Sequence, residues 1–169
     1  VFDDFLHFFG NFAIFSKNGR GKTSLFNAMQ WALFGEVFER GSVRSGRWSD
    51  GRKRTIVGDY SKNPGPMMNQ DAYREMRIPE MNVIIIATQN GKDIQINRVA
   101  KSRVGSMPRV DDDLNQNLTV TIGEEVAQDA KGQELIENLF PNELRRFFFI
   151  DGESLEEYVD LVKAGQGGG

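Results

Sequence analysis

The feature that most constrains this chain is an apolar stretch that leads into a glycine-rich loop and then into a helix-forming segment. Residues 12–15, Phe-Ala-Ile-Phe, have the composition of a buried strand, and residues 16–24 follow as Ser-Lys-Asn-Gly-Arg-Gly-Lys-Thr-Ser. Apolar residues then recur with helical spacing, at Leu25, Ala28, Met29, Ala32 and Leu33. Gly35 is a suitable helix end. This order predicts a phosphate-binding loop in an α/β fold, with the helix packed against a sheet.

The loop has a candidate for each contact that a nucleoside triphosphate requires. Gly19 and Gly21 allow backbone N–H groups to approach the phosphate oxygens, and Lys22 supplies an ammonium group. Thr23 supplies a hydroxyl for Mg²⁺. The usual pattern has glycine where this chain has Ser16, which a serine tolerates if its φ stays negative. We therefore expect ATP and Mg²⁺ to bind the loop residues Ser16, Lys17, Asn18, Gly19, Arg20, Gly21, Lys22, Thr23 and Ser24.

Composition excludes several other classes of protein. The chain has 169 residues, of which 39% are hydrophobic and 27% charged, as expected for one soluble domain. Its longest apolar runs, 83–87 and 147–150, are too short to span a membrane. It has no cysteine, and its single histidine, His7, is expected to be a packing residue rather than a catalytic one, because there is no second histidine for a metal site. We expect a cytoplasmic protein, associated with the nucleoid if it is bacterial, whose natural start lies upstream of Val1.

Residues 36–65 are rich in Arg, Lys, Ser and Gly, which predicts an exposed, mobile insertion. One interpretation is a contact with the duplex DNA backbone, with Trp48 available for stacking. The other is a solvated loop without a partner, because interspersed acidic residues and a net charge of −3 weaken the positive field. The DNA-contact candidates are Arg40, Arg44, Arg47, Arg52, Lys53 and Arg54.

The middle of the chain predicts strands followed by a helix. Two β-rich stretches, 83–88 and 93–99, flank Asn90-Gly91, which is a strong hairpin signal. Residues 101–117 are expected to form a poorly ordered loop before a short strand at 118–122. Residues 132–140 have the apolar spacing of a helix.

Near the end of the chain, the apolar run 147–150 predicts a buried strand that delivers Asp151-Gly152-Glu153 to its carboxyl end. Ser154 and Glu157 form a capping-box pattern, and a helix with one apolar seam is expected after them. The glycine-rich residues 164–169 are expected to be a linker or an artificial end of the chain.

These motifs together resemble the amino-terminal lobe of an SMC-class ABC ATPase head. The matching parts are the loop 18–25, the helix end 30–35, the Asn90-Gly91 hairpin that ends in Arg98, and residues 146–153. The string Phe-Phe-Ile-Asp-Gly-Glu is most similar to the DndD-like and Lamassu-like anti-phage defence ATPases. The resemblance spans most of residues 11–162, so it implies a head lobe at 1–153 and the start of a coiled-coil helix at 154–163.

The resemblance also implies how such a lobe works. The carboxyl-terminal lobe of the same head would supply the remaining motifs, and ATP would be sandwiched between two heads in a homodimer. Accessory or effector subunits are usual. Asp151 stands where the family usually has a glutamine that contacts Mg²⁺, and Glu153 would lie on the γ-phosphate side, although a helix-start acid is an equally good interpretation of it. We therefore predict ATP hydrolysis with Lys22, Asp151 and Glu153 as catalytic residues and Thr23 and Asp151 on Mg²⁺.

Two alternatives stay open. Residues 147–151 could complete a self-contained P-loop ATPase or kinase that uses Asp151 and Glu153, although Gly152 separates the two acids. A nucleotide-gated DNA clamp or sensor with little turnover would use the same residues. The chain has no Asn-Lys-x-Asp motif for guanine, which disfavours a GTPase. The resemblance alone points to action on DNA, in anti-phage defence or in repair.

Overall fold

The structure is a computed structural model. It describes residues 21–37, 43–44, 47–48, 54–59, 66–69, 74–75, 80–103 and 108–141. The expected strand at 147–150, the Asp151-Gly152-Glu153 string, the start of a coiled coil at 154–163 and the tail 164–169 all lie outside these residues.

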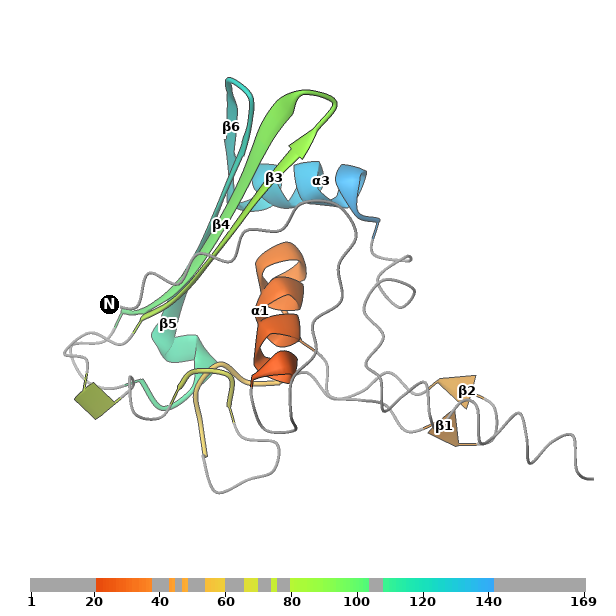
Figure 1. The fold of residues 1–169 in the computed structure, drawn as a ribbon. Helices are drawn as coiled ribbons and strands as arrows, with labels where there is room; N and C mark the ends of the chain where they lie inside the picture. The colour runs from red at the N-terminus through yellow and green to blue at the C-terminus, as the bar shows by residue number, and fades with distance from the viewer. Residues whose placement is uncertain are drawn as a thin grey trace, which may run out of the picture.

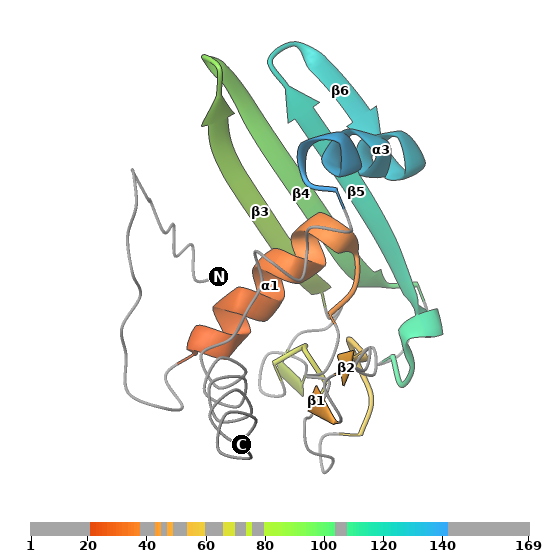
Figure 2. The same cartoon turned by 90° about the vertical axis from the view of Figure 1, so that its right-hand side faces the viewer.

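Two helices cover one face of a four-stranded antiparallel sheet (Figure 1 and Figure 2), so the expected combination of α and β elements is confirmed. The strands, in their order across the sheet, are β3 (Glu80–Gln89), β4 (Lys92–Ser102), β5 (Leu114–Ile122) and β6 (Glu125–Gln128). The helices are α1 (Lys22–Phe34) and α3 (Asp129–Leu139). A two-stranded ladder pairs β1 (Val43–Arg44) with β2 (Arg47–Trp48), and a 3₁₀ turn, η1, spans Asp111–Asp113.

The predicted hairpin around Asn90-Gly91 is confirmed as β3 and β4. Asn90 has φ 53° and Gly91 has φ 74°, the positive values that a tight two-residue hairpin turn needs at both central positions. The strands are longer than predicted, because pairing continues from Gln89↔Lys92 to Glu80↔Lys101. On β4 the buried residues that face the helices alternate with exposed or half-buried ones, which gives the hairpin one buried face.

The predicted loop at 101–117 is wrong at its two ends, and residues 104–107 in its middle lie outside the described residues. β4 continues to Ser102, and β5 already begins at Leu114 rather than at residue 118. The polar residues 115–117 have little intrinsic tendency to form a strand, but the end of β4 provides a hydrogen-bonding partner, with Lys101 opposite Asn115. β6 was not predicted, and it follows β5 through a turn at Gly123, whose φ is 59°.

The helix after the loop is confirmed, but its predicted apolar stripe is partly wrong. Met29 is 40% exposed, whereas Trp31, outside the stripe, is fully buried. The predicted end at Gly35 is confirmed, because Gly35 has φ 71° and its N–H donates to Trp31 O at 2.8 Å. The second predicted helix is also confirmed as α3, which begins at Asp129, before the expected start at residue 132.

The core forms two clusters between the helices and the sheet. One is built around Trp31 and comprises Trp31, Val37, Ile56, Val57, Met68, Ala100 and Leu114. The other comprises Leu33, Ile94, Ile96, Leu118, Val120 and Ile136. The first cluster corrects the expectation that 36–65 is wholly exposed, since Val37, Ile56 and Val57 are buried. Asp111 fixes this segment, because its Oδ1 accepts the N–H groups of Ile56 at 2.8 Å and Val57 at 3.0 Å.

Candidate functional site

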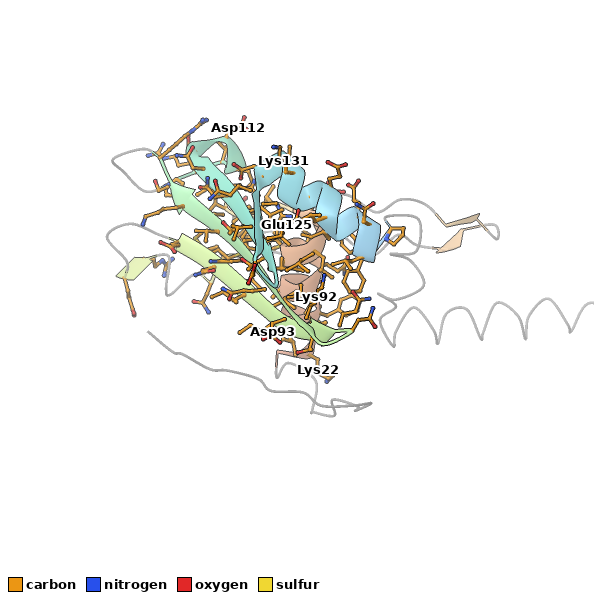
Figure 3. All side chains as sticks on the ribbon, turned by 90° about the horizontal axis from the view of Figure 1, so that it is seen from above. Lys22, Lys92, Asp93, Asp112, Glu125 and Lys131 are labelled. Atoms are coloured by element: carbon orange, nitrogen blue, oxygen red, sulfur yellow. The ribbon has the colours of Figure 1, made fainter. Side chains whose placement is uncertain are left out.

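The first turn of α1 is the described part of the predicted phosphate-binding loop. Gly21 precedes the helix with φ 90°, a conformation that other residues adopt only with strain, and its carbonyl accepts the N–H of Leu25 at 2.9 Å. Lys22 is half-buried, and Thr23 and Ser24 are exposed. Figure 3 shows Lys22 at the edge of the part of the chain that the structure describes. Lys22 and Thr23 are thus consecutive residues at a helix start that is at least partly exposed.

The electrostatics of this helix start suit an anion. The first N–H groups of a helix have no intrahelical acceptor, and the helix dipole places partial positive charge there. The first turn of α1 carries no acidic residue that would occupy those N–H groups. A phosphate group would accept from the amides and meet Lys22 at the same place.

The other predicted site residues are only partly described. Ser16 to Arg20, Asp151 and Glu153 lie outside the described residues, so their roles stay predictions. The same holds for Arg40, Arg52 and Lys53. Of the remaining DNA-contact candidates, Arg44 and Arg47 are paired across β1 and β2, and Arg54 is half-buried, with its backbone N–H bonded to Val37 O at 2.7 Å.

At the opposite end of α1 lies a buried arginine to which sequence reasoning gave no role. Arg98, on β4, is 8% exposed, and its Nε donates to Ala32 O at 3.0 Å. Its Nη2 donates to Gln133 Oε1, on α3, at 2.7 Å. Gln133 Nε2 in turn donates to Leu33 O at 3.2 Å. Arg98 and Gln133, called here the α1 clamp, thus hold two carbonyls of the last turn of α1.

Two features compensate the buried charge of Arg98, the negative charge of Asp129 and the dipole of α1. Burial lowers the pKa of its guanidinium to about 10, and the negative charge of Asp129 partly offsets that shift. The group is therefore still protonated at neutral pH and donates. The carboxyl end of the α1 dipole attracts the same cation.

The sequence contained one signal for Arg98, because this residue interrupts the series of inward-facing apolar residues on β4. Nothing in the sequence distinguished Gln133.

A family model described as an AAA domain matches residues 4–163. The chain belongs to this AAA domain family. It is a family of P-loop ATPases of the type found in SMC-like proteins, which agrees with the left-handed Gly21 directly before α1. No curated protein and no solved structure is similar enough to this AAA domain to count as a match.

The family match supports the coarse assignment of this AAA domain as a nucleotide-binding P-loop fold. Within the described ranges, no group of His, Cys, Asp and Glu side chains is arranged to hold a metal ion by itself. A divalent ion at the helix start would take Thr23 together with ligands from outside those ranges, including phosphate oxygens. In the same part of the chain, no helix is long and apolar enough to cross a membrane.

Proposed function

We propose that this AAA domain binds MgATP at the start of α1 and hydrolyses it as one lobe of an SMC-like head. The observation that carries the proposal is the junction of Gly21, Lys22 and Thr23 at the first turn of α1. Gly21 has the left-handed conformation, the first turn has no acid, and the lysine and threonine follow directly. The family match over residues 4–163 supports the same assignment.

Each residue has a distinct role in this proposal. The backbone N–H groups of residues 16–24 surround the β- and γ-phosphates, and Lys22 neutralises their charge. Thr23 and Asp151 hold Mg²⁺, and Glu153 lies on the γ-phosphate side, where it orients or deprotonates the attacking water. Positioning and electrostatic stabilisation then supply most of the rate enhancement, as is usual in phosphoryl transfer.

The finer part of the proposal concerns assembly and substrate. A carboxyl-terminal lobe completes the head, two ATP-bound heads form a homodimer, and the dimer acts on duplex DNA with accessory or effector subunits. The loop at 18–25 resembles that of SMC-class heads, and the string Phe-Phe-Ile-Asp-Gly-Glu at 148–153 is most similar to the DndD-like and Lamassu-like defence ATPases, so we place the activity in anti-phage defence or DNA repair. The basic residues 40–54 are the proposed DNA contacts, and charge reversal there should weaken binding and reduce its salt dependence together.

The test measures ATP binding and turnover by the full chain, with and without linear and circular duplex DNA. Lys22→Ala and Asp151→Ala are compared with Lys131→Ala, an exposed lysine on α3, as the matched control. Turnover that DNA stimulates, and that only the first two variants lose, supports the proposal. Binding without turnover under every condition would replace it with a nucleotide-gated clamp or sensor. Turnover by a monomer that ignores DNA would favour a self-contained ATPase.

A further inference from the structure

We propose that Arg98 and Gln133 are positioning residues for the nucleotide site, and that they act by fixing the far end of α1. This inference rests on the proposed function of the first turn of α1. The α1 clamp touches neither Lys22 nor Thr23, so its effect must travel through the helix itself. Figure 2 shows the geometry, with one end of α1 lying next to α3 and the other end pointing away from it.

Burial along α1 is uneven, which makes the far end the anchored one. The buried residues of this helix are Gln30, Trp31, Ala32 and Leu33, all in its second half. Thr23 and Ser24, in the first turn, are exposed, and residues 25–28 are half-buried. The orientation of the first turn is therefore set largely by how the last turn is held.

A small change in the tilt of α1 at its last turn produces a large displacement of its first turn, where the phosphates are proposed to bind. α1 has 13 residues, which at 1.5 Å per residue makes it about 20 Å long. A tilt of roughly 5° about the last turn would move the first turn by about 2 Å. Displacements of about 1 Å are enough to cost on the order of a hundredfold in a site that depends on positioning.

The hydrogen bonds of the α1 clamp depend on angle, whereas the contacts of the apolar core hardly do. Packing of Leu33 and its neighbours resists separation of α1 from the sheet but sets its rotation less strictly, because dispersion contacts have little angular preference. The hydrogen bonds to Ala32 O and Leu33 O do have such a preference. They also give hydrogen-bond donors to carbonyls that have no N–H partner within the helix, because the last carbonyls of a helix lie beyond its final backbone hydrogen bonds.

Gly35 leaves the space that the guanidinium needs. A Cβ at Gly35 would lie 3.0 Å from Nη1 of Arg98 and 3.4 Å from its Cζ. The helix end, the strand and α3 thus meet at one point. Gln133 connects α1 to α3, which is the last described helix before the predicted Mg²⁺ ligand Asp151 in the sequence. The clamp therefore links α1, which carries Lys22 and Thr23, to the last described helix before Asp151.

The test separates positioning from stability with paired variants of the full chain. Gln133→Glu keeps the acceptor for Arg98 but removes the donor to Leu33 O, whereas Gln133→Leu removes both. Gln95→Leu, on the exposed face of β4, controls for loss of an amide. Arg98→Lys keeps the charge, and Arg103→Lys, also exposed, is its control. Each variant is measured for ATP affinity, chemical unfolding and amide hydrogen exchange along α1.

We expect Arg98→Lys and Gln133→Leu to weaken ATP binding by about tenfold or more in protein that is still folded. Gln133→Glu should lie between Gln133→Leu and the unaltered chain. Hydrogen exchange should rise in residues 22–28 as well as beside the substitution. Unchanged ATP affinity and exchange confined to residues 30–35, in variants that are merely less stable, would overturn the inference.

The two proposals fail in different ways. If the unaltered chain binds no ATP, or Lys22→Ala binds as well as the unaltered chain, the nucleotide proposal fails. Exchange in residues 22–28 still decides, in that case, whether the clamp sets the position of the first half of α1. If Lys22→Ala loses binding while Gln133→Leu and Arg98→Lys keep it, only the positioning inference fails.

Discussion

The two ends of helix α1 differ in almost every property that matters for their roles. The start is accessible, follows a left-handed glycine and has no acid in its first turn. The end is buried in the core and held by Arg98 and Gln133. A site for an anion must leave its N–H groups free to donate to the ligand. Until the ligand binds, these groups make no hydrogen bond that stabilises the folded protein. These differences support the proposal that the open end of α1 binds the nucleotide while the clamped end holds the helix in place.

The largest expected effect on stability comes from removing the buried guanidinium. Arg98→Met fills similar space but leaves Ala32 O and Gln133 Oε1 without their donor, so we expect the free energy of unfolding to fall by about 3 kcal/mol. Denaturant unfolding measures it. Arg103→Met, at an exposed position, should change the same quantity by less than about 0.5 kcal/mol. Equal changes in the free energy of unfolding for the two variants would show that the hydrogen bonds of Arg98 do not stabilise the fold.

A somewhat smaller loss is expected at the glycine that ends α1. Gly35→Ala places a Cβ against Arg98 and forces alanine to φ 71°, and we expect it to cost about 2 kcal/mol. Gly123→Ala is the control, because its φ is 59° but its Cβ would meet nothing within 4 Å. If thermal or chemical unfolding gives the same loss for both variants, backbone strain alone explains Gly35, and the close approach of Arg98 does not matter.

At the open end, a change should affect function and leave stability alone. Thr23→Val removes the hydroxyl proposed for Mg²⁺ from an exposed position, so ATP affinity should fall by about tenfold in the presence of Mg²⁺ and little in its absence. Thr23→Ser should restore the Mg²⁺ dependence. Titration of ATP with and without EDTA makes the comparison, and equal losses in both conditions would argue against a metal ligand.

The smallest expected effect lies away from α1 and depends on pH. The backbone N–H of Arg109 donates to Asp113 Oδ2 at 2.8 Å, which holds the pKa of that carboxyl below its ordinary value of 3.8. The folded state therefore favours the ionised form, and the stabilisation is present at neutral pH and lost as pH falls below 3.8.

Asp113→Asn should accordingly be less stable than the unaltered chain at pH 6, with the difference shrinking as the pH falls toward 3. Asp112→Asn, at an exposed position in the same turn, is the control. Unfolding midpoints across this pH range provide the measurement. ATP binding at pH 7 should be the same for all three proteins, because this turn is not part of the proposed nucleotide site.

The parts of this fold that sequence predicted have local causes. Asn90-Gly91 adopts the positive φ values of a hairpin turn with little strain, and Gly35 does the same at a helix end, so each is recognisable without knowledge of its neighbours. Ahead of α1 the structure describes only Gly21 of the predicted loop, and its left-handed φ of 90° has the same local cause.

The parts that sequence missed depend on distant partners. Residues 115–117 form a strand only because the end of β4 is available beside them. Ile56 and Val57 are buried although they lie in a polar stretch, because Asp111, far along the chain, accepts both of their N–H groups. The clamp joins Arg98 to a glutamine 35 residues away and to a carbonyl 66 residues away, which no local pattern encodes.

The most direct test of the account measures how far ATP stabilises the protein against unfolding. With Mg²⁺ and ATP at 100 times its dissociation constant, the free energy of unfolding of the unaltered chain should rise by about 2.7 kcal/mol. Lys22→Ala should unfold like the unaltered chain without ATP and gain almost nothing when ATP is added, whereas Lys131→Ala should gain the full amount. Equal stabilisation of Lys22→Ala and Lys131→Ala would contradict the claim that the open end of α1 binds the nucleotide.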